Sequence, residues 1–332
     1  MACLDPLNRP IEYLRLSVTD RCNLRCIYCM PPEGVPWRPH EEILRYEEIV
    51  QVVRVAAELG IRKVRLTGGE PLVRQGLADL IASLARIPGI EDLSMTTNGT
   101  LLEARAEELA AAGLKRVNVS LDSLDPERFA RLTRGGDLTA VLRGIEAARR
   151  AGLNPVKLNT VVVRRWNDDE VTRFARMTRE EGWHVRFIEF MPVGRWQDEG
   201  REAWQERMVT VEEIRRHIEE ALGPLRPYAG PGGAGPARYY RLDGAEGTIG
   251  FISPVSEHFC ARCNRLRLSA DGRLRPCLLS DAEVDLRTLL RNGAGPEEIR
   301  ERLVEAIRRK PAGHRLAEGN FPHERAMSEI GG

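Results

Sequence analysis

The feature that most constrains the fold is a unit repeated along the first 190 residues, in which a helix-like segment ends at a glycine and a short apolar run follows. The glycine stands at positions 60, 113, 152 and 182. Glycine fits the left-handed position after a helix, and a short β-branched run is typical of a strand buried on both faces. Strands are expected at Tyr13–Val18, Lys63–Thr67, Asp92–Thr97, Arg116–Leu121, Val156–Val163 and Val185–Phe190.

Helices are expected between these strands. The stretch "EEIVQVVRVAAELG" at 47–60 shows the helical spacing clearly, with apolar residues at Ile49, Val52, Val53, Ala56 and Leu59. Six strands alternating with helices predict an α/β protein with a parallel sheet, either doubly wound or rolled into a barrel.

The amino-acid composition of the sequence changes after Glu219. Residues 222–247 are rich in Gly and Pro, which predicts a linker or long loop leading into a smaller second region. In that region "NRLRLSADGRLRPC" at 264–277 predicts a hairpin that turns at Asp271 and Gly272. A helix is expected over 296–310, and a polar tail ends the chain at Gly331 and Gly332.

Charge and composition exclude several function classes. The 332 residues include 50 Lys and Arg against 49 Asp and Glu, so no overall basic field favours nucleic acid or an anionic membrane. The apolar runs are far shorter than the roughly 20 residues that span a bilayer, and the first residues lack the apolar stretch of a signal peptide. We therefore expect a cytoplasmic protein. In a reducing cytosol the seven cysteines are expected to be metal ligands rather than disulfides, apart from Cys3, which we interpret as an incidental thiol.

Small or polar residues follow each of the six predicted strands. They are the stretch "TDRCNLRCIYC" at 19–29, Gly68, Gly69 and Glu70 in "TGGEPL", "TTNG" at 96–99, Ser120, Asp122 and Ser123, Lys157 and Asn159, and Glu189 and Met191. Singly, Gly-Gly fits a tight turn and "TTNG" fits a helix cap. Because the loops after parallel strands meet at one end of the sheet, the whole set predicts one binding site there. The stretch "TGGEPL" matches neither G-x-G-x-x-G nor the P-loop pattern, which sets aside nicotinamide and P-loop chemistry.

Three of the seven cysteines, Cys22, Cys26 and Cys29, stand within eight residues of one another in the loop after the first predicted strand. A structural zinc site needs four ligands, and the nearest histidine, His40, lies beyond a Pro-rich stretch. A 4Fe-4S cluster held by only three thiolates leaves one iron open to an outside ligand. The spacing therefore favours a reactive iron-sulfur cluster.

A second triplet, Cys260, Cys263 and Cys277, surrounds the predicted hairpin, which folds Cys277 back toward the other two. His258 could complete a zinc site of three Cys and one His, so the spacing leaves zinc and a second cluster both open. Arg265 and Arg267 alternate on the first hairpin strand. They fit either a solvated strand face or the recognition of a phosphorylated substrate.

Together these motifs resemble a known family. The C-x3-C-x2-C spacing with Tyr28, followed by Gly68, Gly69, Glu70 and Pro71, resembles the radical S-adenosylmethionine superfamily. Within it, the second cysteine triplet, the arginine pair and the Gly-Gly end are similar to the GTP 3′,8-cyclase family of molybdenum cofactor biosynthesis. This resemblance extends over essentially the whole chain.

The resemblance implies an architecture and a set of cofactors. An incomplete (β/α)6 TIM-like barrel would occupy residues 1–222, and a C-terminal region, 223–332, would carry an auxiliary cluster. Two 4Fe-4S clusters would be held by the two cysteine triplets, and the open iron of the second would bind the guanine of GTP. S-adenosylmethionine would bind the first cluster, lined by Tyr28, Gly69, Ser120 and Met191.

The resemblance also implies a reaction. A 5′-deoxyadenosyl radical would take hydrogen from C3′ of GTP, and C3′ would then bond to C8 to give (8S)-3′,8-cyclo-7,8-dihydroguanosine 5′-triphosphate, a lyase reaction. GTP-contacting positions would be Arg15, Arg65, Thr96, Lys157, Arg265, Leu266 and Arg267. Catalysis would depend on Arg15, Arg265, Arg267, Gly331 and Gly332, the last two on a tail that reaches into the site.

Partners implied by the family are an external electron donor, a second copy in a homodimer, and cyclic pyranopterin monophosphate synthase as the enzyme that receives the product. Two other hypotheses compete. Another radical S-adenosylmethionine enzyme with an auxiliary cluster could act on a peptide or other small molecule, but the arginine set and the Gly-Gly end argue against it. A zinc-binding regulatory protein would leave the polar strand ends unexplained.

Overall fold

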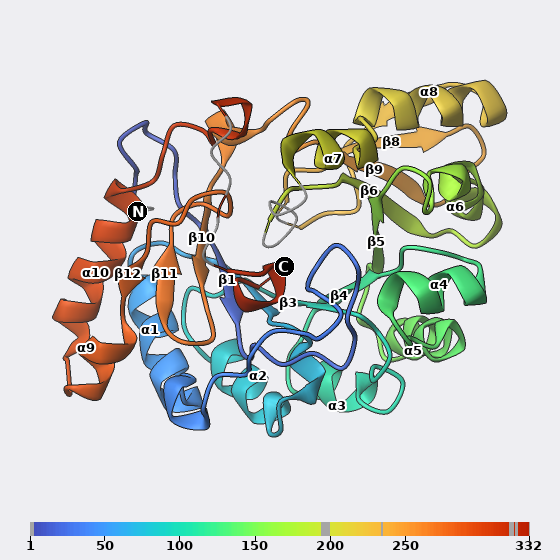
Figure 1. The fold of residues 1–332 in the computed structure, drawn as a ribbon. Coiled ribbons are helices and arrows are strands. Elements are labelled where there is room, and N and C mark those ends of the chain that lie inside the picture. Colours follow the sequence, from blue (N-terminus) through green and yellow to red (C-terminus); the bar gives the residue numbers. More distant parts are fainter. Residues whose placement is uncertain (1–2, 194–199, 234, 319–321, 323–324, 332) are drawn as a thin grey trace.

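A single 12-stranded sheet runs through the molecule (Figure 1). The computed structural model describes residues 3–193, 200–233, 235–318, 322 and 325–331. The spatial order of the strands is β12-β11-β10-β1-β2-β3-β4-β5-β6-β9-β8-β7. The centre of this order is sequential, whereas both edges are built from the C-terminal third of the chain.

The six predicted strands are confirmed, each end within one residue of its expected position, and they pair in parallel. They are β1 (Tyr13–Ser17), β2 (Lys63–Thr67), β3 (Asp92–Thr97), β4 (Arg116–Ser120), β5 (Lys157–Val162) and β6 (His184–Glu189). The expected glycines at 60, 113, 152 and 182 all have positive φ, between 66° and 104°.

The two faces of the sheet differ in chemistry. On β1, Leu14 and Leu16 belong to the hydrophobic core, whereas Tyr13 and Arg15 line a cavity on the other side. Successive side chains of a strand point to opposite faces, so this alternation recurs along the sheet. Burial of the strands on both faces is therefore confirmed, and the second face is covered but lined by polar side chains.

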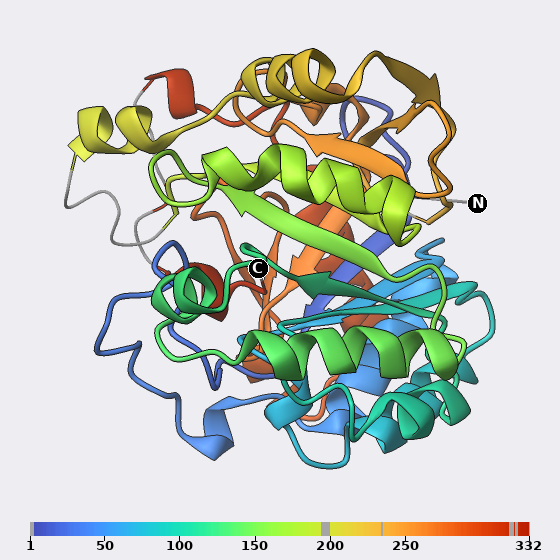
Figure 2. The same cartoon turned by 90° about the vertical axis from the view of Figure 1, so that its right-hand side faces the viewer.

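Helices pack on the apolar face, as the green helices in front of the strands show in Figure 2. The first of them confirms the helix predicted over 47–60 and buries Ile49, Val52, Val53 and Ala56. The helices that alternate with the parallel strands are α1 (Tyr46–Glu58), α2 (Leu77–Ala85), α3 (Ala106–Ala111), α4 (Pro126–Thr133), α5 (Leu138–Arg150) and α6 (Val171–Glu180). Across the described ranges, no helix has the length and apolar character needed to cross a membrane.

The prediction of a linker or long loop over 222–247 is wrong. After α7 (Gly200–Arg207) and α8 (Val211–Leu222), that stretch contains the antiparallel strands β7 (Leu225–Tyr228) and β8 (Arg238–Leu242). Proline is tolerated on an edge strand, and Pro227 lies on β7 at the end of the sheet. The following strand, β9 (Thr248–Ile252), pairs in parallel with β6.

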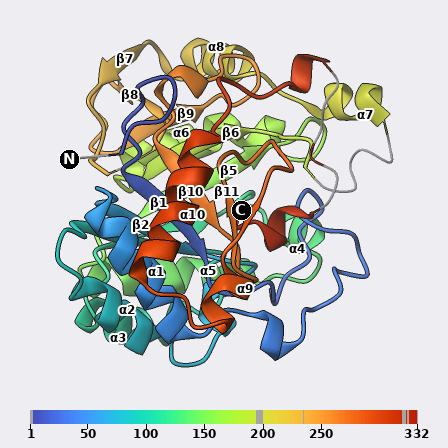
Figure 3. The ribbon, with the colours of Figure 1, turned by 90° about the vertical axis from the view of Figure 1, so that its left-hand side faces the viewer.

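The predicted hairpin is confirmed as β10 (Arg265–Leu268) and β11 (Arg273–Arg275). Its first strand also pairs in parallel with β1, which the sequence did not reveal. The chain continues through β12 (Val284–Asp285), α9 (Arg287–Arg291) and α10 (Pro296–Arg308), and Figure 3 shows α10 beside α1. The C-terminal segment lies in the middle of the molecule, among the strands (Figure 1).

Candidate active site

A cavity of about 280 Å³ lies on the polar side of the sheet, lined from β1 through β6 and from β9 and β10. It brings together most of the residues that the sequence singled out. They are the six cysteines of the two triplets, Tyr28, Gly69, Ser120 and Met191, and Arg15, Arg65, Thr96, Arg265 and Arg267. Lys157, Leu266 and Gly331 are not among the lining residues, and Gly332 lies outside the described residues.

The loop that carries the first triplet is held by the Gly-Gly turn after β2. The Gly69 amide donates to the Thr19 carbonyl at 2.9 Å, and the next amide, of Glu70, donates to the Arg21 carbonyl at 2.8 Å. A Cβ on Gly69 would lie 2.4 Å from the Arg21 oxygen, which is far too close. Glycine is needed here because the cysteine loop itself passes against the turn.

Glu70 joins the ends of β2 and β3 beneath that loop. It is fully buried, and its carboxylate accepts from Thr97 Oγ1 at 2.7 Å, from the Asn98 amide at 2.6 Å and from the Leu72 amide at 3.0 Å. Burial raises the pKa of Glu70 to about 7, although these hydrogen bonds oppose the shift. Asn98 Nδ2 lies 3.9 Å from Cys22 Sγ, so the "TTNG" turn supports the first triplet directly.

Tyr28 is fixed by a buried carboxyl group after β4. Its hydroxyl donates to Asp122 Oδ2 at 2.5 Å, and the Val161 amide donates to Asp122 Oδ1 at 2.8 Å. Burial raises the pKa of Asp122 to about 6. The aromatic ring beside the first triplet is therefore held in place from β4 and β5.

The second triplet lies where the hairpin meets the end of α10. The Cys263 amide donates to the Cys260 carbonyl at 3.1 Å. Lys310 Nζ donates to the carbonyls of Arg265 and Pro276, at 2.7 Å each, and so bridges the two hairpin strands. Burial favours a higher pKa for Cys263, but the charges of Arg265 and Lys310 outweigh it and lower that pKa to about 7.

His258 does not complete a zinc site at this triplet. Its side chain is exposed, with its ring 5.5 Å from the ring of His314. Within the part of the chain that the structure describes, no three His, Cys, Asp or Glu side chains converge on one metal ion. A set of three thiols is the donor set that an iron-sulfur cluster with one open iron requires.

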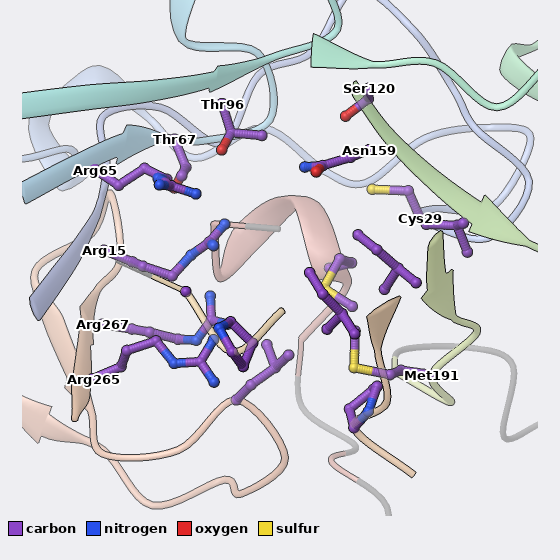
Figure 4. A pocket seen from close by; sticks show the side chains of 18 of the residues that line it. Arg15, Cys29, Arg65, Thr67, Thr96, Ser120, Asn159, Met191, Arg265 and Arg267 are labelled. Carbon is purple, nitrogen blue, oxygen red and sulfur yellow. The ribbon is translucent and has the colours of Figure 1, made fainter. Parts of the chain in front are cut away.

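Five arginines line the cavity, and Figure 4 shows four of them on the side opposite Cys29 and Met191. Arg15 lies on β1, Arg65 on β2, Arg186 on β6, and Arg265 and Arg267 on β10. In the described ranges, Arg186, Arg265 and Arg267 have no carboxylate partner. Buried guanidinium groups without carboxylates are costly unless an anion completes them.

Arg186 was missed by the sequence analysis. It is 3% exposed, and its Nε and Nη2 atoms have no hydrogen-bond partner among the described residues. Burial lowers its pKa to about 10. The sequence contains a pattern that could have identified it. In "HVRFIE" Arg186 stands between the core residues Val185 and Phe187, so it must point to the opposite face of the strand.

Two predicted GTP contacts lie away from the cavity lining. Lys157 is buried on β5, where it donates to the Gly232 carbonyl, and burial followed by the charge of Arg186 lowers its pKa to about 7. The Leu266 side chain packs into the hydrophobic core, on the opposite face of β10 from its arginine neighbours.

The C-terminal tail enters the cavity between the two triplets. The Gly331 carbonyl accepts from Arg15 Nη2 at 3.0 Å and from Arg267 Nη1 at 3.3 Å. Its φ of 77° favours glycine, and a Cβ there would lie 2.5 Å from Thr67 Oγ1. Earlier in the tail, Met327 and Ile330 form one apolar cluster with Leu279, against which Cys29 and Cys277 pack.

Comparisons with known proteins agree with this site. Residues 16–178 match the Radical SAM superfamily, and residues 183–316 match Molybdenum Cofactor Synthesis C. The fold is similar to that of Streptococcus suis SuiB bound to S-adenosylmethionine, with a TM-score of 0.58 and 14% identity over 85% of this chain and 66% of that one. Fold and cysteine loop together define a protein of the radical SAM class.

Relatives in sequence narrow the class further. A GTP 3′,8-cyclase of Pelotomaculum thermopropionicum is 55% identical, and one of Thermodesulfovibrio yellowstonii is 52% identical, each over 99% of both chains. The chain belongs to the GTP 3′,8-cyclase family.

Proposed function

We propose that this protein converts GTP to (8S)-3′,8-cyclo-7,8-dihydroguanosine 5′-triphosphate, a lyase reaction that begins molybdenum cofactor biosynthesis. Membership of the GTP 3′,8-cyclase family supports this reaction. The observation that carries it is the shared cavity, which two cysteine triplets line together with five buried or half-buried arginines. A triphosphate carries about four negative charges and needs several fixed cations of this kind.

Each cofactor would have its own residues. Cys22, Cys26 and Cys29 would hold the first 4Fe-4S cluster, and S-adenosylmethionine would lie against Tyr28, Gly69, Ser120 and Met191. The chemistry that this cluster supplies when bound is the one-electron cleavage of S-adenosylmethionine. Cys260, Cys263 and Cys277 would hold the second cluster.

The protein's own side chains would bind and orient the substrate. Arg15, Arg65, Thr96, Arg265 and Arg267, which line the cavity, would contact GTP, and Lys157 would act on the triphosphate through its charge from behind the lining. The tail ending in Gly331 and Gly332 would exclude water from the space between the cofactors. Tyr28, held by Asp122, would keep its ring beside the first cluster.

The proposal also covers the barrel architecture, the extent of the two regions and the partners of the protein. The sheet would form an incomplete (β/α)6 barrel over residues 1–222, followed by the cluster-bearing region 223–332. The protein would work in the cytoplasm as a homodimer, take electrons from an external donor and pass its product to cyclic pyranopterin monophosphate synthase.

One anaerobic experiment tests the proposal. We expect about eight iron and eight sulfide per chain, from two clusters of four. With dithionite, S-adenosylmethionine and GTP, the protein should form 5′-deoxyadenosine together with a cyclised GTP product. Stoichiometric zinc without iron would favour the regulatory hypothesis. Cofactor cleavage that leaves GTP unchanged would favour a radical enzyme with another substrate.

A further inference from the structure

A buried ion pair joins the C-terminal tail to the turn of the β10–β11 hairpin. Arg325 is 8% exposed, and its Nη1 and Nη2 atoms each lie 3.0 Å from one carboxylate oxygen of Asp271. Arg325 Nη2 also donates to Glu283 Oε2 at 2.9 Å. Paired bonds of this kind fix the direction of the guanidinium as well as its distance, and a buried pair is costly to break on one side only.

The same ion pair is connected to both cysteine loops. Asp271 lies 3.6 Å from Arg38 Nε, and the Arg38 amide donates at 2.7 Å to Asp20, two residues before Cys22. On the other side, Glu283 pairs with the fully buried Arg275, two residues before Cys277. Arg325 therefore joins an ion-pair network that extends to the segments that carry the two triplets.

The tail beyond Arg325 is short and is held again at its far end. Only five residues separate Arg325 from Gly331, whose carbonyl accepts from Arg15 and Arg267. Between them, the Glu329 amide donates to the Ala326 carbonyl at 3.1 Å. Fixing the first residue of so short a segment restricts where its last carbonyl can lie, because the chain has few remaining free dihedrals.

We infer that Arg325 and Asp271 form a latch, and that this latch positions the Gly331 carbonyl between Arg15 and Arg267. Arg325 is thus a positioning residue, which is not among the residues that line the cavity and acts through the tail. The inference rests on the proposed function only for its catalytic consequence, that ordered arginines bind GTP more tightly. The attachment of the tail itself is a structural property and is measured separately.

The test uses full-length protein with its clusters assembled. Arg325→Gln, Arg325→Lys, Asp271→Asn and the double variant Arg325→Gln with Asp271→Asn are compared with the native chain. Arg226→Gln is the matched control, because Arg226 makes the same paired contact with Asp243 but is exposed and lies on β7. The readouts are iron content, hydrogen exchange of the amides at 326–331, and the KM and kcat for GTP.

We expect Arg325→Gln and Asp271→Asn each to speed exchange in the tail by roughly tenfold or more and to raise the KM for GTP several-fold, with iron content unchanged. The double variant should be less impaired than the sum of the two single effects, because the Arg325–Asp271 pair is already lost in each single variant. Arg325→Lys keeps the charge but loses the paired geometry, so its increases in tail exchange and in KM should be smaller than those of Arg325→Gln.

Native exchange rates in both single variants, or effects that add in the double variant, would overturn the latch. An equal change in Arg226→Gln would do the same. If the native protein formed no cyclised GTP while tail exchange still depended on Arg325, the proposed function would fail and the latch would stand.

Discussion

The two cysteine triplets have the same number of thiols and opposite electrostatic surroundings. At the first, burial and then the neighbouring thiols and Asp122 raise the pKa of Cys26 well above its usual value, and burial raises that of Cys29 to about 12. At the second, burial raises the pKa of Cys277 and acts in the same direction on Cys263, but the charges of Arg265 and Lys310 outweigh it there and lower the pKa of Cys263 to about 7. The cavity therefore has one half beside the carboxyl groups of Glu70 and Asp122 and one cationic half. We interpret the first as the place of a cofactor with little net charge and the second as the place of a polyanion.

The largest effect expected from this division is a separation of cofactor cleavage from product formation. Cys26→Ala should lose about four of about eight iron atoms and all formation of 5′-deoxyadenosine. Cys263→Ala should lose about the same amount of iron but keep cleavage of S-adenosylmethionine, without cyclised GTP. Iron analysis and chromatography of 5′-deoxyadenosine and of the cyclised GTP product check this. Equal loss of cleavage in the two variants would break the comparison.

The next prediction concerns how the first half is built. Gly69→Ala forces a methyl group against the Arg21 carbonyl, so the first cysteine loop must shift and 5′-deoxyadenosine formation should fall at least about tenfold. The second cluster should stay intact and be visible by electron paramagnetic resonance. Gly295→Ala is the control, because the nearest atom to its Cβ would be 4.0 Å away. Normal activity in Gly69→Ala would show that the turn does not position the loop.

In the cationic half, removing an arginine should lower the affinity for GTP without lowering the stability of the free protein. Arg186→Met removes a buried charge that lacks a carboxylate partner in the described ranges, so the protein without GTP should unfold at the same temperature or higher. GTP affinity should fall roughly 10- to 100-fold, because a charge-assisted contact is lost. Calorimetry measures both quantities. Arg226→Met, at an exposed ion pair, should change neither, and a stability loss without an affinity loss at Arg186 would contradict the interpretation.

The smallest expected effect is a pH dependence from Lys157. Burial and then Arg186, Arg116 and Arg65 lower its pKa to about 7, so its charge is lost as the pH rises through that value. GTP affinity should therefore weaken from about pH 6 to about pH 8, and Lys157→Met should remove this part of the slope. In the unfolded chain the pKa of a lysine is about 10.4. Between about pH 7 and about pH 10 the unfolded state therefore binds more protons than the folded state, so the stability of the free protein should rise with pH. Identical pH profiles in the native chain and Lys157→Met would contradict the prediction.

The parts of the fold and site with local signals were predictable from the sequence. Apolar runs between glycines gave the six parallel strands, and cysteine spacing gave both triplets. Parallel pairing of β10 with β1 joins residues about 250 positions apart and leaves no local pattern, so the hairpin was predicted but its attachment to the edge of the parallel strands was not. Arg186 had a local signal in its alternation with core residues. Arg325 had none, because only the folded chain brings it to Asp271.

The placement of β9 and β10 also bears on whether the chain can be divided. The six consecutive parallel strands, taken alone, would expose the unpaired backbone groups of β1 and β6, which are the edges that invite association with other chains. The C-terminal third covers both edges and, on one of them, places Arg267 opposite Arg15. A fragment ending near residue 190 would therefore lose the second triplet together with Arg265 and Arg267, and it would expose two unpaired strand edges that favour association with other chains.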